Sequence, residues 1–224
     1  MCPPSSFPTA ESTTPSAINT DFVPPTDIAQ AAFKTSSHVA PSILNHSIRV
    51  YLHASALAKS SDSVYALTNN PAKHDLLFTA CILHDIGTCD TYDGPQRFEV
   101  EGADGAVALL RSFQVDEKDI HDVWVAIAIH TSAGIAERIH ELARLVREAV
   151  LIDFGKLLGG DEVVELKKQV EEAYPRLGVE KELGNSVVGQ AVRRPGKAPP
   201  ASWPGILYRS HLAEPEWKGV NKAF

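Results

Sequence analysis

Three features are missing from this chain of 224 residues, and each absence argues against a class of protein. No apolar stretch approaches the ~20 residues that span a bilayer, so we expect no membrane partner. The first residues lack a basic segment followed by an apolar one, which argues against a secretory signal. Basic residues are outnumbered, 21 against 28 Asp and Glu, and the net charge of −7 argues against a nucleic-acid partner.

Cysteine is also scarce. The three cysteines, Cys2, Cys81 and Cys89, have neither the spacing of a zinc-binding pair nor that of a redox CxxC motif. A reduced, cytoplasmic chain is the simplest expectation. The sequence also lacks internal repeats and the alternation of Val and Ile with polar residues that is typical of strands.

Helical periodicity is what the chain does have. Hydrophobic residues make up 44% of the sequence, which is typical of a globular protein. Apolar residues spaced three and four apart, with capping residues before them, predict helices. The predicted ranges are about 26–35, 41–59, 71–86, 98–113, 116–129, 136–158, 161–174 and 180–193.

These helices predict an all-α bundle, with residues 26–224 forming a single domain. Residues 1–25 are rich in Pro, Ser and Thr, and we expect a disordered or loosely packed tail there. Residues 195–224 are rich in proline, and we expect an irregular C-terminal extension that packs back on the body. Gly87 is expected to end the third helix as a left-handed cap.

Three His-Asp dipeptides stand out, and their contexts differ. His74-Asp75 and His121-Asp122 lie in the early turns of predicted helices, where an aspartate favours the helix dipole and a structural role is expected. His84-Asp85 instead follows the apolar run 76–83 and precedes Ile-Gly, where capping explains nothing. Its charge at the margin of the core requires a partner or a metal.

Two further polar residues lie on apolar helix faces. His46 shares a stripe with Ile43 and Val50, and Asp153 continues a stripe that includes Val146 and Val150. Alone, His46 would be a satisfied core histidine more often than a ligand. Together with His84-Asp85, both residues are candidates for a metal site.

The order His46 … His84-Asp85 … Asp153 resembles the HD-domain superfamily of all-α, metal-dependent enzymes. The resemblance covers about residues 41–158 and implies one divalent metal with four ligands. These are His46, His84, Asp85 and Asp153.

The segments Arg97–Asp104 and Ile129–Glu137 resemble the cyanamide hydratase branch of that superfamily, which converts cyanamide to urea. The resemblance implies a hydro-lyase acting on a small nitrile, with Asp85 and His130 as catalytic residues. It also implies Phe98, Glu99 and Thr88 as neighbours of the substrate. Many related phosphohydrolases have lysine where this chain has Thr88, which disfavours a phosphate ester.

Two imidazoles and two carboxylates suit Zn²⁺, and Fe²⁺ or Mn²⁺ as well. Such a metal lowers the pKa of bound water, to about 7 in favourable zinc sites, and the water can then add to the nitrile carbon. A proton must reach the nitrile nitrogen, either from His130 or from a metal-bound water. The sequence leaves both donors open.

Three alternatives to cyanamide hydration remain at this stage. One is an HD phosphohydrolase acting on nucleotides or other phosphate esters, and another is a hydratase of a related nitrile or isonitrile. The third is a binding module with a structural metal, whose site would be closed to water. The sequence also leaves open whether the chain forms a homo-oligomer.

Overall fold

The computed structural model describes residues 20–157 and 160–224, and within them it is entirely helical. The all-α prediction is confirmed. None of the helices in these ranges combines the length and the low polarity that a membrane crossing requires. The elements are α1 Asp27–Ser36, α2 Pro41–Ser60, α3 Pro71–Leu83, η1 Ile86–Thr88, η2 Asp90–Tyr92, α4 Phe98–Ser112, α5 Glu117–Ala128, α6 Ala136–Ile139, α7 Glu141–Asp153, α8 Asp161–Ala173, α9 Val179–Arg193, η3 Pro195–Lys197 and α10 Trp203–Ala213.

The starts of the helices follow the capping residues. The hydroxyl of Thr26 accepts from the amide of Ala29 at the start of α1, and Asp116 caps α5 through the amide of Lys118. Proline occupies the first turn of α2 and α3, where its missing N–H costs nothing. Local signals therefore define these helices before any tertiary contact forms.

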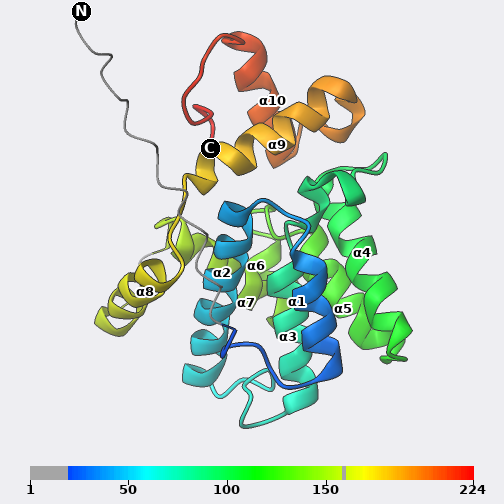
Figure 1. Cartoon of the computed structure of the whole chain (residues 1–224), viewed down its shortest axis with the longest axis vertical. Helices are drawn as coiled ribbons and strands as arrows, with labels where there is room; N and C mark the ends of the chain where they lie inside the picture. Colours follow the sequence, from blue (N-terminus) through cyan, green and yellow to red (C-terminus); the bar gives the residue numbers. More distant parts are fainter. Residues whose placement is uncertain (1–19, 158–159) are drawn as a thin grey trace, which may run out of the picture.

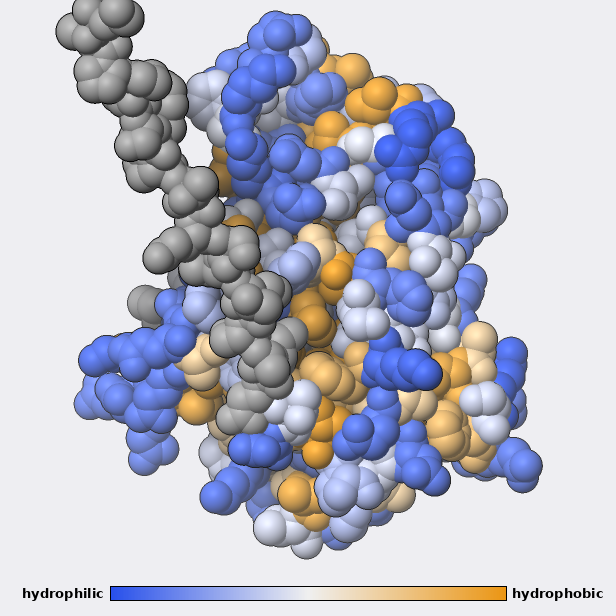
Figure 2. Space-filling model, viewed as in Figure 1, coloured by the Kyte–Doolittle hydropathy of each residue, from blue (hydrophilic) through white to orange (hydrophobic). Residues whose placement is uncertain are grey.

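The body is built around α2, which packs against α3 and α7, while α4 packs against α5 (Figure 1). α9 and α10 pack on each other beyond one end of this body, and α8 projects from its side (Figure 1). Most of α8 is exposed, with Val170 its one buried residue, and Figure 2 shows this projection as mostly hydrophilic. The core of the protein lies mainly among α1 to α5 and α7, and buried residues of α9 and α10 extend it.

The turn after α3 differs from the prediction. The left-handed glycines of the described residues are Gly134, Gly155 and Gly178, whereas Gly87 lies in the short helix η1. A Cβ at Gly87 would lie 2.0 Å from the carbonyl oxygen of Phe98, at the start of α4. Gly87 is therefore required by the close approach of α4 and not by a left-handed cap.

Replacing Gly87 with alanine is expected to destabilise the protein by about 1–3 kcal/mol, because backbone must move to admit the methyl group. Gly196→Ala is the matched control, since a Cβ there meets nothing within 4 Å. Thermal unfolding of both variants checks this prediction. Equal melting temperatures for the two would contradict the close approach at Gly87.

The predicted helix over 136–158 is wrong in its extent. The backbone of His140 is extended (φ −164°, ψ 169°), which separates α6 from α7, and the His140 ring accepts from the amide of Ala143 as an N-cap. α7 ends at Asp153, and the predicted end at Leu158 lies outside the described residues. Histidine carries no strong helix-stop signal, so the break was not visible in the pattern.

The C-terminal extension is more regular than predicted. It contains α10, whose N-terminus is capped by Ser202 and carries Pro204 in its first turn. The extension does pack back on the body, as expected. We name residues 179–224 the C-terminal cap.

Two contacts fasten the C-terminal cap to the segment that follows α3. The buried side chain of Gln190 donates to the carbonyl oxygen of Gly87 (2.8 Å). Asp93 pairs with Arg193 (2.9 Å) and with the buried Lys197. The loop 88–96 is therefore anchored to the cap.

The tail prediction falls largely on residues 1–19, which lie outside the described residues. Its last part packs on the body: Val23 is buried, and the Phe22 ring contacts the rings of Phe33, Phe78 and Tyr174. We therefore include residues 20–25 with the helical body.

Candidate metal centre

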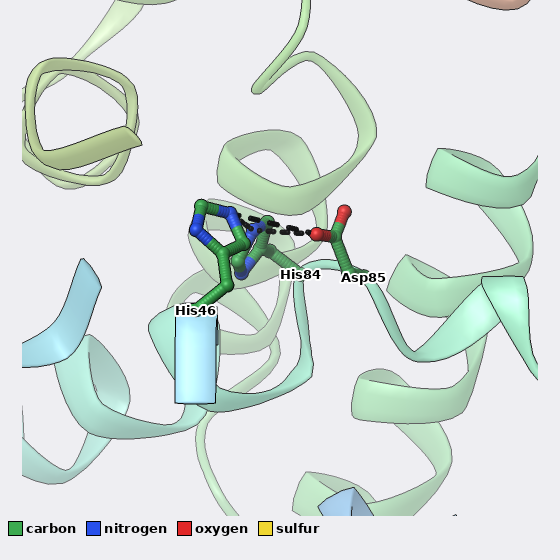
Figure 3. Close-up of side chains that lie close together, drawn as sticks. All are labelled: His46, His84 and Asp85. Carbon is green, nitrogen blue, oxygen red and sulfur yellow. Dashed lines mark hydrogen bonds and ion pairs between the residues drawn. The ribbon is translucent and has the colours of Figure 1, made fainter. Parts of the chain in front are cut away.

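A cavity of about 430 Å³ lies where the C-terminal cap meets the body. His46 from α2, His84 and Asp85 from the end of α3, and His130 from the end of α5 line its floor. Figure 3 shows the two imidazoles and the carboxylate of the first three turned toward one another. The fold thus brings together residues that are 84 positions apart in sequence at their extremes, from 46 to 130.

The polar atoms at this floor are close enough to share one ion. Nε2 of His46 lies 3.2 Å from Nε2 of His84, and Oδ2 of Asp85 lies 3.6 Å from the His46 nitrogen and 3.1 Å from the His84 nitrogen. One ligand atom from each of the three residues falls within 4.8 Å of the others. His130 completes the group, with its Nε2 3.4 Å from Oδ1 of Asp85.

Two of the three imidazoles are held by a backbone carbonyl oxygen. Nδ1 of His84 bonds the carbonyl oxygen of Cys81 (2.8 Å), and Nδ1 of His130 bonds that of Ile127 (2.7 Å). A carbonyl oxygen only accepts, so both Nδ1 atoms carry the hydrogen. The unprotonated Nε2 of each ring then faces the cavity. A hydrogen-bond acceptor at Nδ1 orients a metal-binding histidine in this way.

The surroundings of Asp85 also suit a bound cation. The side chain is buried, and neither carboxylate oxygen has a well-formed hydrogen bond within the described residues. Burial would raise the pKa of Asp85, but the charges and contacts of His84 and His130 outweigh burial and hold it well below its usual value. A buried, ionised carboxylate whose only close polar neighbours are histidine rings fits a divalent cation.

The fourth expected ligand, Asp153, is not in this group. Its Oδ2 accepts from Nδ1 of His46 (2.7 Å), on the far side of the ring from the cavity. Arg49 donates from Nε to Oδ1 (2.6 Å) and from Nη2 to Oδ2 (2.9 Å). The structure thus places Asp153 behind His46, with both of its oxygens bonded to the buried Arg49.

The electrostatics of this pair agree with that placement. Burial lowers the pKa of His46 despite the neighbouring Asp153, so the ring is in the neutral form that binds metals. Burial would raise the pKa of Asp153, but its bonds to His46 and Arg49 lower it instead. Asp153 is therefore an ionised acceptor that fixes the tautomer of His46.

Asp153→Asn is expected to weaken metal affinity about 10- to 100-fold, as loss of a partner behind a ligand does, while leaving one site per chain. Competition with a chelator on folded protein measures this. Asp85→Asn is the comparison. It alters a predicted ligand itself and should lose more metal affinity than Asp153→Asn. If the two variants lose equal affinity, Asp153 ligates the metal directly.

The residues expected beside the substrate occupy the second layer of the site. The Thr88 hydroxyl donates to the carbonyl oxygen of Asp85 (2.6 Å), so it stabilises the turn. The fully buried Glu99 accepts from Arg97 (2.6 Å) and from the hydroxyl of Thr131 (2.8 Å), which itself lines the cavity. Phe98 lies behind the wall, with its ring 5.7 Å from that of His130.

The other histidine–aspartate pairs have structural partners. Nδ1 of the buried His74 bonds the carbonyl oxygen of Tyr65, and its Nε2 bonds the hydroxyl of Tyr51 (both 2.8 Å). Asp122 pairs with Lys118 one turn earlier on α5 (3.0 Å). Neither pair joins the metal group, in agreement with their positions early in helices.

Sequence reasoning missed much of the cavity wall. Phe154, Trp203 and Phe224 line it, together with Arg147 and Lys156. The cap signal at Ser202 and the proline at position 204 could have indicated α10, but no local pattern shows that its first residue faces a metal site.

The geometry defines a class before any comparison: an all-helical protein with a buried His-His-Asp group that suits a divalent metal, open to a cavity. Residues 43–151 match the family model described as HD domain. Over these residues the chain is therefore similar to HD domains, which are generally those of metal-dependent hydrolases, and this similarity suggests an enzyme. No curated protein matches the chain.

Proposed function

We propose that this protein is a divalent-metal-dependent hydratase that adds water to the carbon of a nitrile, with the conversion of cyanamide to urea as the simplest case. The cavity wall carries the proposal. It is largely apolar and aromatic, and it includes Phe154, Trp203 and Phe224. Such a wall favours an uncharged substrate over a phosphate ester, whose charge would be costly to bury.

The bound divalent ion would supply the acidity that makes a water molecule nucleophilic at neutral pH. His46, His84 and Asp85 would hold that ion. His130 presents Nε2 to the same place, 3.4 Å from Oδ1 of Asp85. There it can take a proton from the adding water and return it to the nitrile nitrogen, with Asp85 stabilising the charged ring between the two transfers.

A metal-dependent phosphohydrolase is the second candidate, and one observation favours it: Arg147 and Lys156 line the cavity. Both cations are already bound. Arg147 donates to Glu137 (3.1 Å) and to the carbonyl oxygen of His130 (3.1 Å), while Lys156 donates to the backbone oxygen of Phe224 (2.9 Å). Releasing them for a phosphate would break these bonds, so we rank this activity second.

The test is the release of urea from cyanamide, measured beside phosphate release from a panel of nucleotides and phosphate esters. Metal-loaded protein is compared with protein treated with a chelator. The proposal expects urea from the loaded protein alone. Phosphate release without urea would overturn it in favour of the phosphohydrolase.

Loss of the His130 side chain is expected to lower kcat about 10²- to 10⁴-fold, the range for a general acid–base group, while metal content changes less than about twofold. His130→Ala is compared with His121→Ala, a histidine of another His-Asp pair outside the cavity. Turnover and metal are measured on the same samples. If metal content falls as far as turnover, His130 serves the metal and not proton transfer.

A further inference from the structure

We infer that the substrate carries an apolar substituent about the size of an aryl ring, held by the aromatic wall that the C-terminal cap completes. As a statement about nitriles this inference rests on the proposed function. It names a narrower class than cyanamide: nitriles, including substituted cyanamides, whose body fills the cavity beside the metal group.

The first observation is a closed circuit of aromatic rings at the cavity. From His46 it runs to Phe154 (centroids 4.6 Å apart), then to Phe224 (5.2 Å) and to Trp203 (5.5 Å). Phe98 follows at 6.0 Å, and it contacts His130 at 5.7 Å. The imidazoles of the metal group close the circuit at 4.9 and 5.1 Å. The rings are thus in contact with one another, and those that line the cavity give it an aromatic surface on which an aryl group can pack.

The second observation is the volume. At about 430 Å³ the cavity lies within the range of sites for drug-sized ligands. Cyanamide has three heavy atoms, and one water molecule occupies about 30 Å³ in the liquid. Cyanamide would therefore fill only a small part of the cavity.

The third observation is that the polar groups of the wall are bonded within the protein. Thr131 donates to Glu99, Arg147 to Glu137, and the Ser202 hydroxyl donates to the carbonyl oxygen of Pro199 (2.6 Å). These three wall side chains are thus already bonded within the protein, which disfavours a charged or strongly polar substituent beside them. An apolar substituent needs no hydrogen bond at this wall.

The residues that complete the wall lie outside the HD domain match, which ends at residue 151. Leu183, Trp203, Ile206 and Phe224 all belong to the C-terminal cap and line the cavity. The metal group and the substrate wall therefore come from different parts of the chain. Trp203, at the start of α10, is the residue we assign to substrate selection.

The experiment compares cyanamide with benzylcyanamide, which share the reacting group and differ by one aryl substituent. Metal-loaded wild-type protein is expected to show a kcat/KM about 10- to 100-fold higher for benzylcyanamide, the gain from burying an apolar group of that size. Trp203→Ala should lose about tenfold of that preference at unchanged metal content, while Trp203→Phe keeps most of it. Trp217→Ala is the matched control, an exposed tryptophan of the same cap outside the cavity.

Equal kcat/KM for the two nitriles, or a preference for cyanamide, would overturn the inference and leave the proposed function standing. Turnover of neither nitrile would overturn the proposed function. In that case calorimetric titration with benzylurea and urea still decides what the cavity binds. Tighter binding of benzylurea that Trp203→Ala removes and Trp217→Ala preserves supports the inference, and equal binding overturns it.

Discussion

Asp85→Asn is expected to lower kcat by about 10³-fold or more, and to abolish the rise in melting temperature that a divalent metal produces. Loss of a partner behind a metal ligand already costs 10- to 100-fold, and Asp85 is itself a predicted ligand. Its two oxygens are buried beside the rings of His46, His84 and His130. An amide there removes the negative charge that attracts the ion.

The chain contains a matched control for this variant. Asp122 also follows a histidine, but it pairs with Lys118 at the surface of α5. Asp122→Asn should keep both turnover and the metal-induced stabilisation, which follows from binding to the folded state alone. If Asp85→Asn keeps turnover within a few-fold of Asp122→Asn, the assignment of the metal group is wrong.

Arg49→Met is expected to destabilise the protein by about 3–5 kcal/mol, because it leaves the Asp153 carboxylate buried without its main partner. Arg49 is fully buried and holds Asp153 through two bonds, while a third reaches the carbonyl oxygen of Tyr174 (2.9 Å). For a chain of this length such a loss lowers the melting temperature by roughly 10 °C or more. Thermal unfolding of metal-free protein measures it.

Arg111→Met is the control, since Arg111 forms an exposed pair with Glu117 whose loss should change stability little. The double variant Arg49→Met, Asp153→Asn should recover part of the loss, because it removes the uncompensated charge. The pKa of Asp153 is depressed, so its pairing stabilises the protein at neutral pH and the contribution disappears as pH falls through that pKa. A cost for Arg49→Met equal to that of Arg111→Met would contradict the buried pair.

Sequence periodicity predicted the helices that carry the metal group. The group itself was predicted because His46, His84 and Asp85 interrupt otherwise apolar faces, and a buried polar group requires a partner. The same reasoning did not predict the position of Asp153 behind His46. Arg49 lies one turn after His46, and an arginine in a helix pattern is ordinarily taken as exposed. Only the tertiary structure shows that it is buried and that it engages the carboxylate.

The cavity wall was beyond sequence reasoning for a different reason. Trp203 and Phe224 contact Phe154 and Phe98 across more than 50 residues of chain, and no local pattern encodes such a contact. Gly87 illustrates the same limit. The sequence shows that position 87 is a glycine. It does not show that the carbonyl oxygen of Phe98 lies too close for any larger residue.

The most direct test of this account is the metal content of purified protein after equilibration with Zn²⁺ and removal of the excess, determined by elemental analysis. We predict one equivalent per chain for the wild type and for His121→Ala, and less than a tenth of that for His46→Ala and His84→Ala. A wild-type chain that binds no divalent metal, or His46 and His84 variants that keep a full equivalent, would contradict the metal centre on which the proposed function depends.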